Sequence, residues 1–479
     1  MRKIPWLSCL IFVCLTGRGQ TAGLKLAEAV QQLESDSQMR HAILGIVVAD
    51  AKTGEIIFAR NEQTGLAAAS TQKIITGAAA FEMLGNDYRY KTRIGYSGKP
   101  DKNGVVNGHL YILGSGDPTL GSWRYSGTKD SFILSQWTAI IKKNIRRISG
   151  GIAMYDGTFS SQVIPDGWIW QDIGNYYGAG ACALNWKENQ YDLVLASGDQ
   201  AGSKVRVIKS GDIISENGDA DALIKSRYDN ELKAAARGSG DNAYIYLPVN
   251  GTRSLLKGTI PAGENAFKIS GALPDPQLTF HSDLSNALSK QSPFFTTPAK
   301  KVAMVRVAGK AEVDQLTMIH THLSPPLDSI HYWFMRRSIN LYGEALIKTI
   351  ALEKAGYGDT DTGLKLVKDF WAGRGISRNA INIIDGSGLS PQNRITADAL
   401  LKILLFARSR PWYNSFFESL PTYNGMKLKS GSIGGARAFA GYHTSAKGQQ
   451  YAIVIIVNNY SGSSAEIVKK MFKVLDLLK

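Results

Sequence analysis

A run of small and apolar residues at positions 69–81, ASTQKIITGAAAF, constrains the fold more than any other stretch. Its apolar residues recur at helical spacing, and its alanines leave room for close neighbours, so it predicts a helix packed inside a domain. Ser70 and Lys73 are one helical turn apart and therefore lie on the same face. A serine beside a lysine at a buried helix start suggests a nucleophile with its own base.

The S-x-x-K spacing is weak evidence by itself, because the chain contains it twice more. Ser126 precedes Lys129, and Ser254 precedes Lys257. Ser126 lacks a helix of small apolar residues behind it. The Ser70 helix therefore needs partners elsewhere in the chain before it can be assigned a chemistry.

The first residues have the layout of a signal peptide. Arg2 and Lys3 precede an apolar run over residues 4–16, and small or polar residues follow to Ala22. The run is too short to span a membrane, and no later segment reaches the roughly 18 apolar residues that a transmembrane helix needs. We therefore expect residues 1–22 to be removed and the protein to be periplasmic or otherwise extracytoplasmic.

Cysteine content and net charge limit the kinds of cross-link and of binding partner that this protein can have. After removal of the signal, Cys182 is the only cysteine, so the mature chain has no intramolecular disulfide. The net charge of +15 is spread along the chain without a basic motif. Nucleic acid is a poor partner for such an exported protein. An anionic cell-envelope polymer is a better candidate partner than nucleic acid. A cationic surface that has no dedicated partner explains the positive charge equally well.

The element pattern indicates an α/β domain that is split in sequence. Residues 42–60 read as a β-hairpin leading to the Ser70 helix, and residues 93–299 are rich in short strands, glycines and turns. A helical pattern returns from residue 292 and runs without a break through residues 327–352. The end of the chain, residues 437–478, reads as strand, turn, strand and helix.

Two further motifs supply what a serine acylase needs besides a nucleophile and a base, namely a proton relay and an oxyanion hole. Ser338 and Asn340, in a helix-like stretch, offer a hydroxyl and an amide. Lys429 begins the sequence Lys-Ser-Gly-Ser, which offers a cation and a strand edge. Gly431 would let a substrate approach that edge closely.

These motifs also have chance matches. K-[ST]-G occurs at Lys52 and Lys209, and S-x-N occurs at Ser215 and Ser377. Lys52 falls in the predicted hairpin turn, and Ser377 falls in a polar loop. Only Lys429 precedes an apolar strand that can pack on a core.

The order S-x-x-K, S-x-N, K-[ST]-G resembles that of the penicillin-recognising serine acylases. The closer resemblance is to D-alanyl-D-alanine carboxypeptidase/endopeptidases of the penicillin-binding protein 4 type. Four stretches carry it: Ala69-Ser70-Thr71-Gln72-Lys73, Gly116-Asp117-Pro118-Thr119-Leu120, Ser338-Ile339-Asn340-Leu341-Tyr342 with Glu344, and Asp385-Gly386-Ser387-Gly388-Leu389-Ser390.

The resemblance implies a fold and an organisation. Residues 23–92 and 300–479 would form a β-lactamase/transpeptidase-like domain, an antiparallel sheet flanked by helices. Residues 93–299 would form a β-rich insertion of two subdomains, which fills the long interval between Lys73 and Ser338.

The resemblance also implies a role for each motif residue. Ser70 would be acylated, Lys73 would accept its proton, and Ser338 would relay a proton to the leaving D-alanine. The implied substrate-binding residues are Asn340, Lys429, Ser430, Ser432 and Asp156, with the backbone N–H groups of Ser70 and Ser432 as the oxyanion hole. The substrates would be peptidoglycan stem peptides, β-lactams would be covalent inhibitors, and no cofactor or metal would be needed.

Departures from the family pattern leave some properties open. Pro391 stands where relatives carry an arginine for the stem-peptide side chain, so the preferred side chain is undetermined. A β-lactamase on a related scaffold and an inactive envelope-binding relative are the alternatives. The sequence also leaves open the balance of carboxypeptidase and endopeptidase activity, a homodimer, and peripheral association with a membrane.

Overall fold

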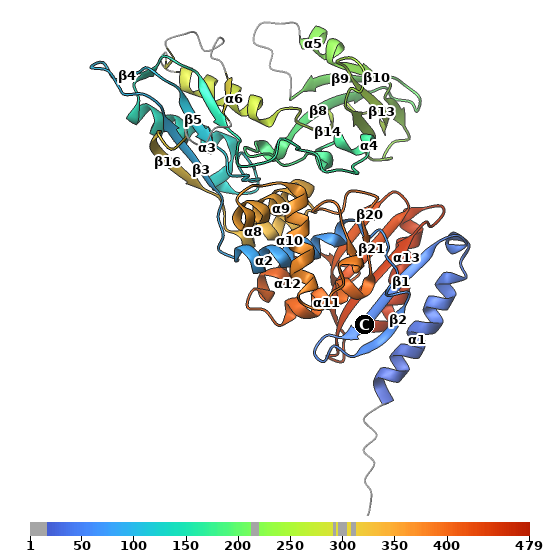
Figure 1. The fold of residues 1–479 in the computed structure, drawn as a ribbon. Coiled ribbons are helices and arrows are strands. Elements are labelled where there is room, and N and C mark those ends of the chain that lie inside the picture. Colours follow the sequence, from blue (N-terminus) through green and yellow to red (C-terminus); the bar gives the residue numbers. More distant parts are fainter. Residues whose placement is uncertain (1–16, 212–219, 291–293, 296–303, 308–312) are drawn as a thin grey trace, which may run out of the picture.

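The computed structural model describes residues 17–211, 220–290, 294–295, 304–307 and 313–479. Most of the predicted signal peptide lies outside these ranges, and the first described element is helix α1 (Gly17–Glu34). Figure 1 shows a lower part, built from both ends of the chain, and two upper lobes built from its middle. In the described ranges, no helix combines the length and the apolar character that crossing a membrane requires.

The lower part is organised on one six-stranded antiparallel sheet with the strand order β19-β20-β21-β22-β1-β2. Strand β1 pairs along its whole length with β22, from Ile43 opposite Asn458 to Asp50 opposite Tyr451. The bounds are β1 Ile43–Asp50, β2 Ile56–Arg60, β19 Thr422–Tyr423, β20 Met426–Ile433, β21 Ala436–Thr444 and β22 Gln450–Asn458. The two ends of the chain thus share one sheet, and the predicted hairpin over residues 42–60 is confirmed.

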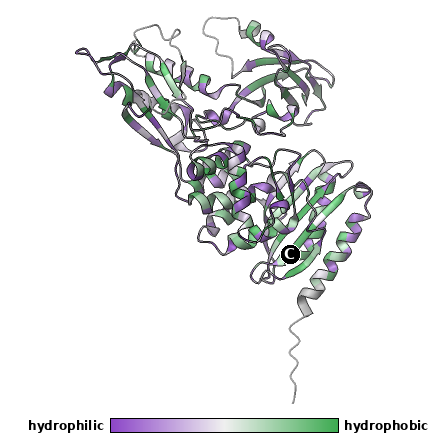
Figure 2. Ribbon diagram, in the orientation of Figure 1, coloured by the Kyte–Doolittle hydropathy of each residue, from purple (hydrophilic) through white to green (hydrophobic). Residues whose placement is uncertain are grey.

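Helices cover both faces of this sheet. On one face lie α2 Lys73–Leu84, α8 Leu327–Arg336, α9 Asn340–Ala355, α10 Thr360–Ala372, α11 Ala397–Arg408 and α12 Tyr413–Ser419. On the other face lie α1 and α13 (Ser464–Leu475). In β1, the side chains of Val47 and Ala49 belong to the core under the first group of helices. Those of Ile46 and Val48 belong to the core under α1 and α13. Because both faces are buried, the strand reads as a continuous apolar run, and Figure 2 shows the sheet as predominantly hydrophobic.

The middle of the chain forms two lobes with separate cores. The first has a five-stranded sheet in the order β15-β7-β5-β3-β16, with helices packed against it. Its elements are β3 Lys91–Tyr96, β5 Leu110–Leu113, β7 Ile152–Tyr155, β15 Met304–Val307, β16 Thr317–Leu323, α3 Asp130–Asn144 and α6 Pro276–Ser289, with the short pair β4 Val105–Val106 and β6 Arg147–Ile148.

The second lobe combines a three-stranded and a four-stranded sheet. Its elements are β8 Gln190–Ser197, β9 Val205–Ser210, β10 Tyr228–Asn230, β11 Lys233–Ala235, β12 Asn242–Tyr246, β13 Ser254–Pro261, β14 Phe267–Ala272, α4 Trp170–Ile173 and α5 Ala220–Arg227. A small pair, β17 Ile381–Asn382 and β18 Arg394–Ile395, belongs to the lower part.

The structure corrects three expectations about elements. Helix α6 lies in a region expected to hold strands and loops, and Asp275 caps it by accepting from the Leu278 N–H. Strand β16 lies where a helical pattern was expected to return, and both β15 and β16 extend the insertion's sheet beyond the expected boundary at 299/300, which itself lies outside the described residues. The stretch 327–352 is two helices, α8 and α9, which are separated at Ser338.

Candidate active site

The nucleophile candidate sits on a tight turn at the start of α2. Ser70 belongs to a 3-10 turn, Ala69–Gln72, that continues directly into the helix, and this agrees with the predicted helix over residues 69–81. The turn begins with Ala69 at φ +47°, a left-handed conformation that is unfavourable for a residue with a Cβ atom. The Thr71 hydroxyl and N–H both donate to the Ala68 carbonyl and stabilise the turn.

Lys73 is fully buried directly behind Ser70. Its Nζ donates to Ser70 Oγ at 2.9 Å, to Asn340 Oδ1 at 2.7 Å and to the Ser387 carbonyl at 2.7 Å. Burial lowers the pKa of Lys73 to about 7, although the charges of Asp385 and Glu344 oppose this. A lysine that is partly neutral at neutral pH and touches a serine hydroxyl can act as its base.

Ser338 occupies the break between α8 and α9 instead of a helical turn. Its φ of +55° is incompatible with a continuing helix, and the new helix begins at Asn340. This bend directs the hydroxyl to Lys429, whose Nζ donates to Ser338 Oγ at 3.0 Å and to the Ser430 carbonyl at 2.8 Å. Burial and the charge of Lys73 lower the pKa of Lys429 well below its ordinary value.

Strand β20 runs directly alongside the Ser70 turn. A Cβ atom on Gly431 would lie 2.2 Å from the Ala68 carbonyl oxygen and 3.2 Å from the Ser70 nitrogen, so only glycine fits there. This approach places the edge of β20 next to the backbone N–H of Ser70, as an oxyanion hole requires. Ser430, on the same face of the strand as Ser432, donates its hydroxyl to the Tyr423 hydroxyl at 3.1 Å.

Asp385 joins three separate parts of the chain. One carboxylate oxygen accepts from Gln72 Nε2, Asn393 Nδ2 and the Gly388 N–H, at 3.0, 2.9 and 2.8 Å. The other accepts from Trp168 Nε1 at 2.9 Å and from the Ser390 N–H. The motif that begins at Asp385 is therefore the support that holds the loop of Ser387 under Lys73, a role that its sequence alone did not reveal.

The site opens into a cavity of about 740 Å³. Four of the expected residues line it: Ser70, Ser338, Asn340 and Ser432. Lys73 and Lys429 lie buried behind this wall. Ser430 and Asp156 are not among the lining residues, and Asp156 follows β7 with its carbonyl accepting from the Phe159 N–H.

The opposite wall comes from the insertion and was not anticipated. It contains Trp123, Arg124, Ile169, Gln171, Asp172, Tyr176, Tyr177, Glu188, Gln190 and Tyr244. Tyr177 is in direct contact with the motif residues, since its carbonyl accepts from Asn340 Nδ2 at 2.8 Å. No spacing pattern marks these residues, because they lie far from the three motifs in sequence. Within the described ranges, no cluster of three or more His, Cys, Asp or Glu side chains could hold a metal.

A sheet covered by helices on both faces, with a serine and a buried lysine at its edge, is the arrangement of the penicillin-recognising serine acylases. The profile of the D-Ala-D-Ala carboxypeptidase 3 (S13) family matches residues 26–477. The chain belongs to this family and is a serine-type D-Ala-D-Ala carboxypeptidase.

Individual relatives agree with this assignment. A D-alanyl-D-alanine carboxypeptidase of Actinomadura sp. (strain R39) is 27% identical over 96% of this chain and 86% of its own. The carboxypeptidase DacB of Haemophilus influenzae is 23% identical over 93% of this chain and 90% of its own. The crystal structure of penicillin binding protein 4 (dacB) from Haemophilus influenzae has the same fold, with a TM-score of 0.77 at 21% identity over 95% of this chain and 99% of that one.

Proposed function

We propose that Ser70 is the acylated nucleophile and Lys73 its base. The observation that carries this is the 2.9 Å contact between Lys73 Nζ and Ser70 Oγ, made by a buried lysine whose pKa is lowered to about 7. The neutral fraction of Lys73 takes the proton as Ser70 Oγ attacks the carbonyl between the two D-alanines. The backbone N–H groups of Ser70 and Ser432 stabilise the resulting oxyanion.

The second pair, Ser338 and Lys429, acts on the leaving group. Ser338 Oγ touches Lys429 Nζ and lines the cavity, so it can pass a proton to the departing D-alanine nitrogen. A terminal carboxylate bound next to Lys429 would stabilise the charged form of this lysine against the burial that lowers its pKa, and Ser432 lines the same cavity. Asn340 fixes Lys73 through its Oδ1 and, in the substrate complex, holds the amide of the penultimate residue.

The substrates would be peptidoglycan stem peptides. We propose removal of the terminal D-alanine and, where the cavity takes a second peptide, cleavage of D-alanyl cross-links. The protein would act outside the cytoplasm, exported by residues 1–22. A related penicillin binding protein 4 has been solved in complex with a β-lactam, and we propose that β-lactams acylate Ser70 and deacylate slowly. The acylase domain would comprise residues 23–90 and 324–479, with the insertion between them.

A single experiment tests the assignment. Wild type and Ser70→Ala are incubated with a labelled penicillin and, separately, with a disaccharide pentapeptide. We expect a stable label on the wild type and release of D-alanine, with both lost in the variant. Rapid turnover of the penicillin would instead identify a β-lactamase, and an unlabelled wild type would identify an inactive relative.

A further inference from the structure

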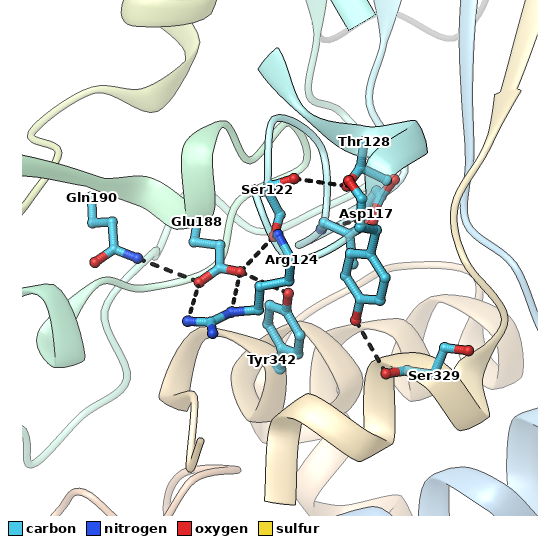
Figure 3. A network of polar contacts seen from close by, with 10 residues as sticks. Asp117, Ser122, Arg124, Thr128, Glu188, Gln190, Ser329 and Tyr342 are labelled. Atoms are coloured by element: carbon cyan, nitrogen blue, oxygen red, sulfur yellow. Dashed lines mark hydrogen bonds and ion pairs between the residues drawn. The ribbon is translucent and has the colours of Figure 1, made fainter. Parts of the chain in front are cut away.

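Glu188, in the insertion, places a buried carboxylate against the catalytic part, and the mechanism above does not use it. Its side chain is 1% exposed. Figure 3 shows the hydrogen bonds that converge on it from separate segments. The donors are Ser122 Oγ at 2.7 Å, Arg124 Nε at 2.7 Å and Nη2 at 3.1 Å, Tyr342 OH at 2.9 Å and Gln190 Nε2 at 3.3 Å.

The backbone around Glu188 is held in an unfavourable conformation. Lys187, Glu188 and Asn189 have φ values of +53°, +53° and +51°, although none of them is glycine. Asn189 holds the turn, because its side chain accepts from the Trp186 N–H and donates to the Gly180 carbonyl. Consecutive left-handed residues persist only where the surroundings enforce them, and such strain is concentrated at functional sites.

The charge of Glu188 is balanced locally. Arg124 binds it through two nitrogens, and the guanidinium lies 5.3 Å from the ring of Trp123 and 5.4 Å from the ring of Trp333 on α8. A buried ion pair of this kind contributes little net stability, but the connected hydrogen bonds around it restrict the geometry of their members. The carboxylate is therefore a rigid acceptor for its other donors, among them Tyr342 of α9.

Tyr342 connects this acceptor to the catalytic residues. It lies in the first turn of α9, two positions after Asn340, and its side chain is fully buried. Asn340 in turn accepts from Lys73 Nζ at 2.7 Å. The start of α9 has no side-chain cap of its own, so the hydrogen bond of the Tyr342 hydroxyl adds to those of Asn340 in fixing its position.

We propose that Glu188 is a positioning residue for the acylation step. Through Tyr342 it fixes the first turn of α9, and it thereby keeps Asn340 in contact with Lys73 and Ser338 at the cavity wall. The insertion thus takes part in setting the catalytic geometry. This inference rests on the proposed roles of Ser70 and Lys73.

The test compares Tyr342→Phe with Tyr90→Phe. Tyr90 is equally buried and its hydroxyl also bonds to α9, where it accepts from Thr349 Oγ1 at 3.1 Å, but far from Asn340. Both variants lose one buried hydroxyl, so their thermal stabilities should fall to a similar extent. We expect the rate constant for labelling by penicillin to fall about tenfold in Tyr342→Phe and to change less than twofold in Tyr90→Phe.

A second measurement, the pH dependence of labelling, distinguishes a positioning role of Tyr342 from a general loss of rigidity in α9. If Asn340 no longer holds Lys73, the pH at which labelling reaches half its maximal rate should move in Tyr342→Phe and stay in place in Tyr90→Phe. Glu188→Gln, which keeps the shape but removes the charge, should reproduce the slower labelling. Equal rates in the two tyrosine variants, or an unmoved pH profile, would overturn the inference. An unlabelled wild type would instead refute the proposed function itself.

Discussion

At the scale of single residues, backbone conformation distinguishes the S-x-x-K motif at Ser70 from the two other matches in the chain. Ser70 and Lys73 lie on one continuous helical turn, so their side chains meet. Lys129 has an extended ψ of 141°, which turns it away from the helical course after Ser126. Ser254 and Lys257 belong to strand β13, where residues three apart point to opposite faces. The same spacing therefore brings two side chains together at only one of the three sites.

The protonation of Lys73 gives a prediction about pH. Because burial lowers the pKa of Lys73 to about 7 and only the neutral amine can accept the proton of Ser70, labelling by penicillin should slow as the pH falls through about 7. The titratable groups that interact electrostatically with Lys73 are Asp385, Glu344 and Lys429. Stopped-flow labelling from about pH 5 to about pH 9, on both sides of that pKa, measures this acidic limb of the rate profile. A rate that is flat across this range would contradict Lys73 as the base.

A substitution of Glu344 tests how a neighbouring carboxyl group affects this pH dependence of labelling. Burial and the neighbouring Asp385 raise the pKa of Glu344 to about 8, and its ionised form would raise the pKa of Lys73. With a pKa of about 8, Glu344 is mostly protonated where the rate falls near pH 7, so the neutral Glu344→Gln should leave the position of this limb nearly unchanged. The Gly386 N–H donates to Glu344 Oε2 at 2.9 Å, and the glutamine oxygen can still accept this bond. A limb that moves clearly to lower pH would show instead that Glu344 carries its charge at neutral pH and raises the pKa of Lys73.

At the scale of elements, the site depends on where helices and strands stop. The helix pattern of residues 327–352 has apolar residues on both sides of Ser338, and nothing in it marks a break. The break exists because Ser338 adopts a left-handed conformation, with its hydroxyl against Lys429 of β20. Strand β20, in turn, can reach the Ser70 turn only because it carries glycine at position 431.

Gly431→Ala tests this contact between elements. The added methyl would lie 2.2 Å from the Ala68 carbonyl oxygen, so β20 must shift away from the Ser70 turn and widen the proposed oxyanion hole. We expect the rate of penicillin labelling to fall by about 10²-fold or more, the size of effect seen when one oxyanion donor is lost. Gly127→Ala is the control, since a methyl there meets nothing within 4 Å. Labelling at the wild-type rate in Gly431→Ala would exclude β20 from the oxyanion hole.

At the scale of the whole molecule, the insertion and the catalytic part hold each other through polar contacts. Lys348 on α9 is buried and donates to the carbonyls of Gln162 and Ala181 at 2.6 and 3.0 Å. Burial lowers the pKa of Lys348. Trp168 supplies a further contact by donating to Asp385. The segments around residues 160–185 thus support both α9 and the loop beneath Lys73.

Lys348→Met measures the strength of this junction. Methionine retains most of the apolar volume but removes the donor from the buried Ala181 carbonyl and the part-buried Gln162 carbonyl. Loss of a buried donor costs about 1–3 kcal/mol of stability in typical cases. We expect the midpoint of denaturant unfolding to fall, together with slower penicillin labelling. Lys365→Met, at an exposed lysine on α10, should leave both close to wild type. An unchanged midpoint in Lys348→Met would show that these carbonyls find other donors.

The sequence determined the chemistry of this protein, and the tertiary structure decided its geometry. Local patterns predicted the buried Ser70 helix, the paired Lys73, the other two motifs and the strand with its glycine, because each depends on neighbours within a few residues. They did not predict the break at Ser338, the support from Asp385 or the contact of Glu188 with α9. Those depend on side chains that are remote in the chain, such as Lys73 and Asn340, 267 positions apart. Only the folded sheet, with the insertion packed over it, brings them within hydrogen-bonding distance.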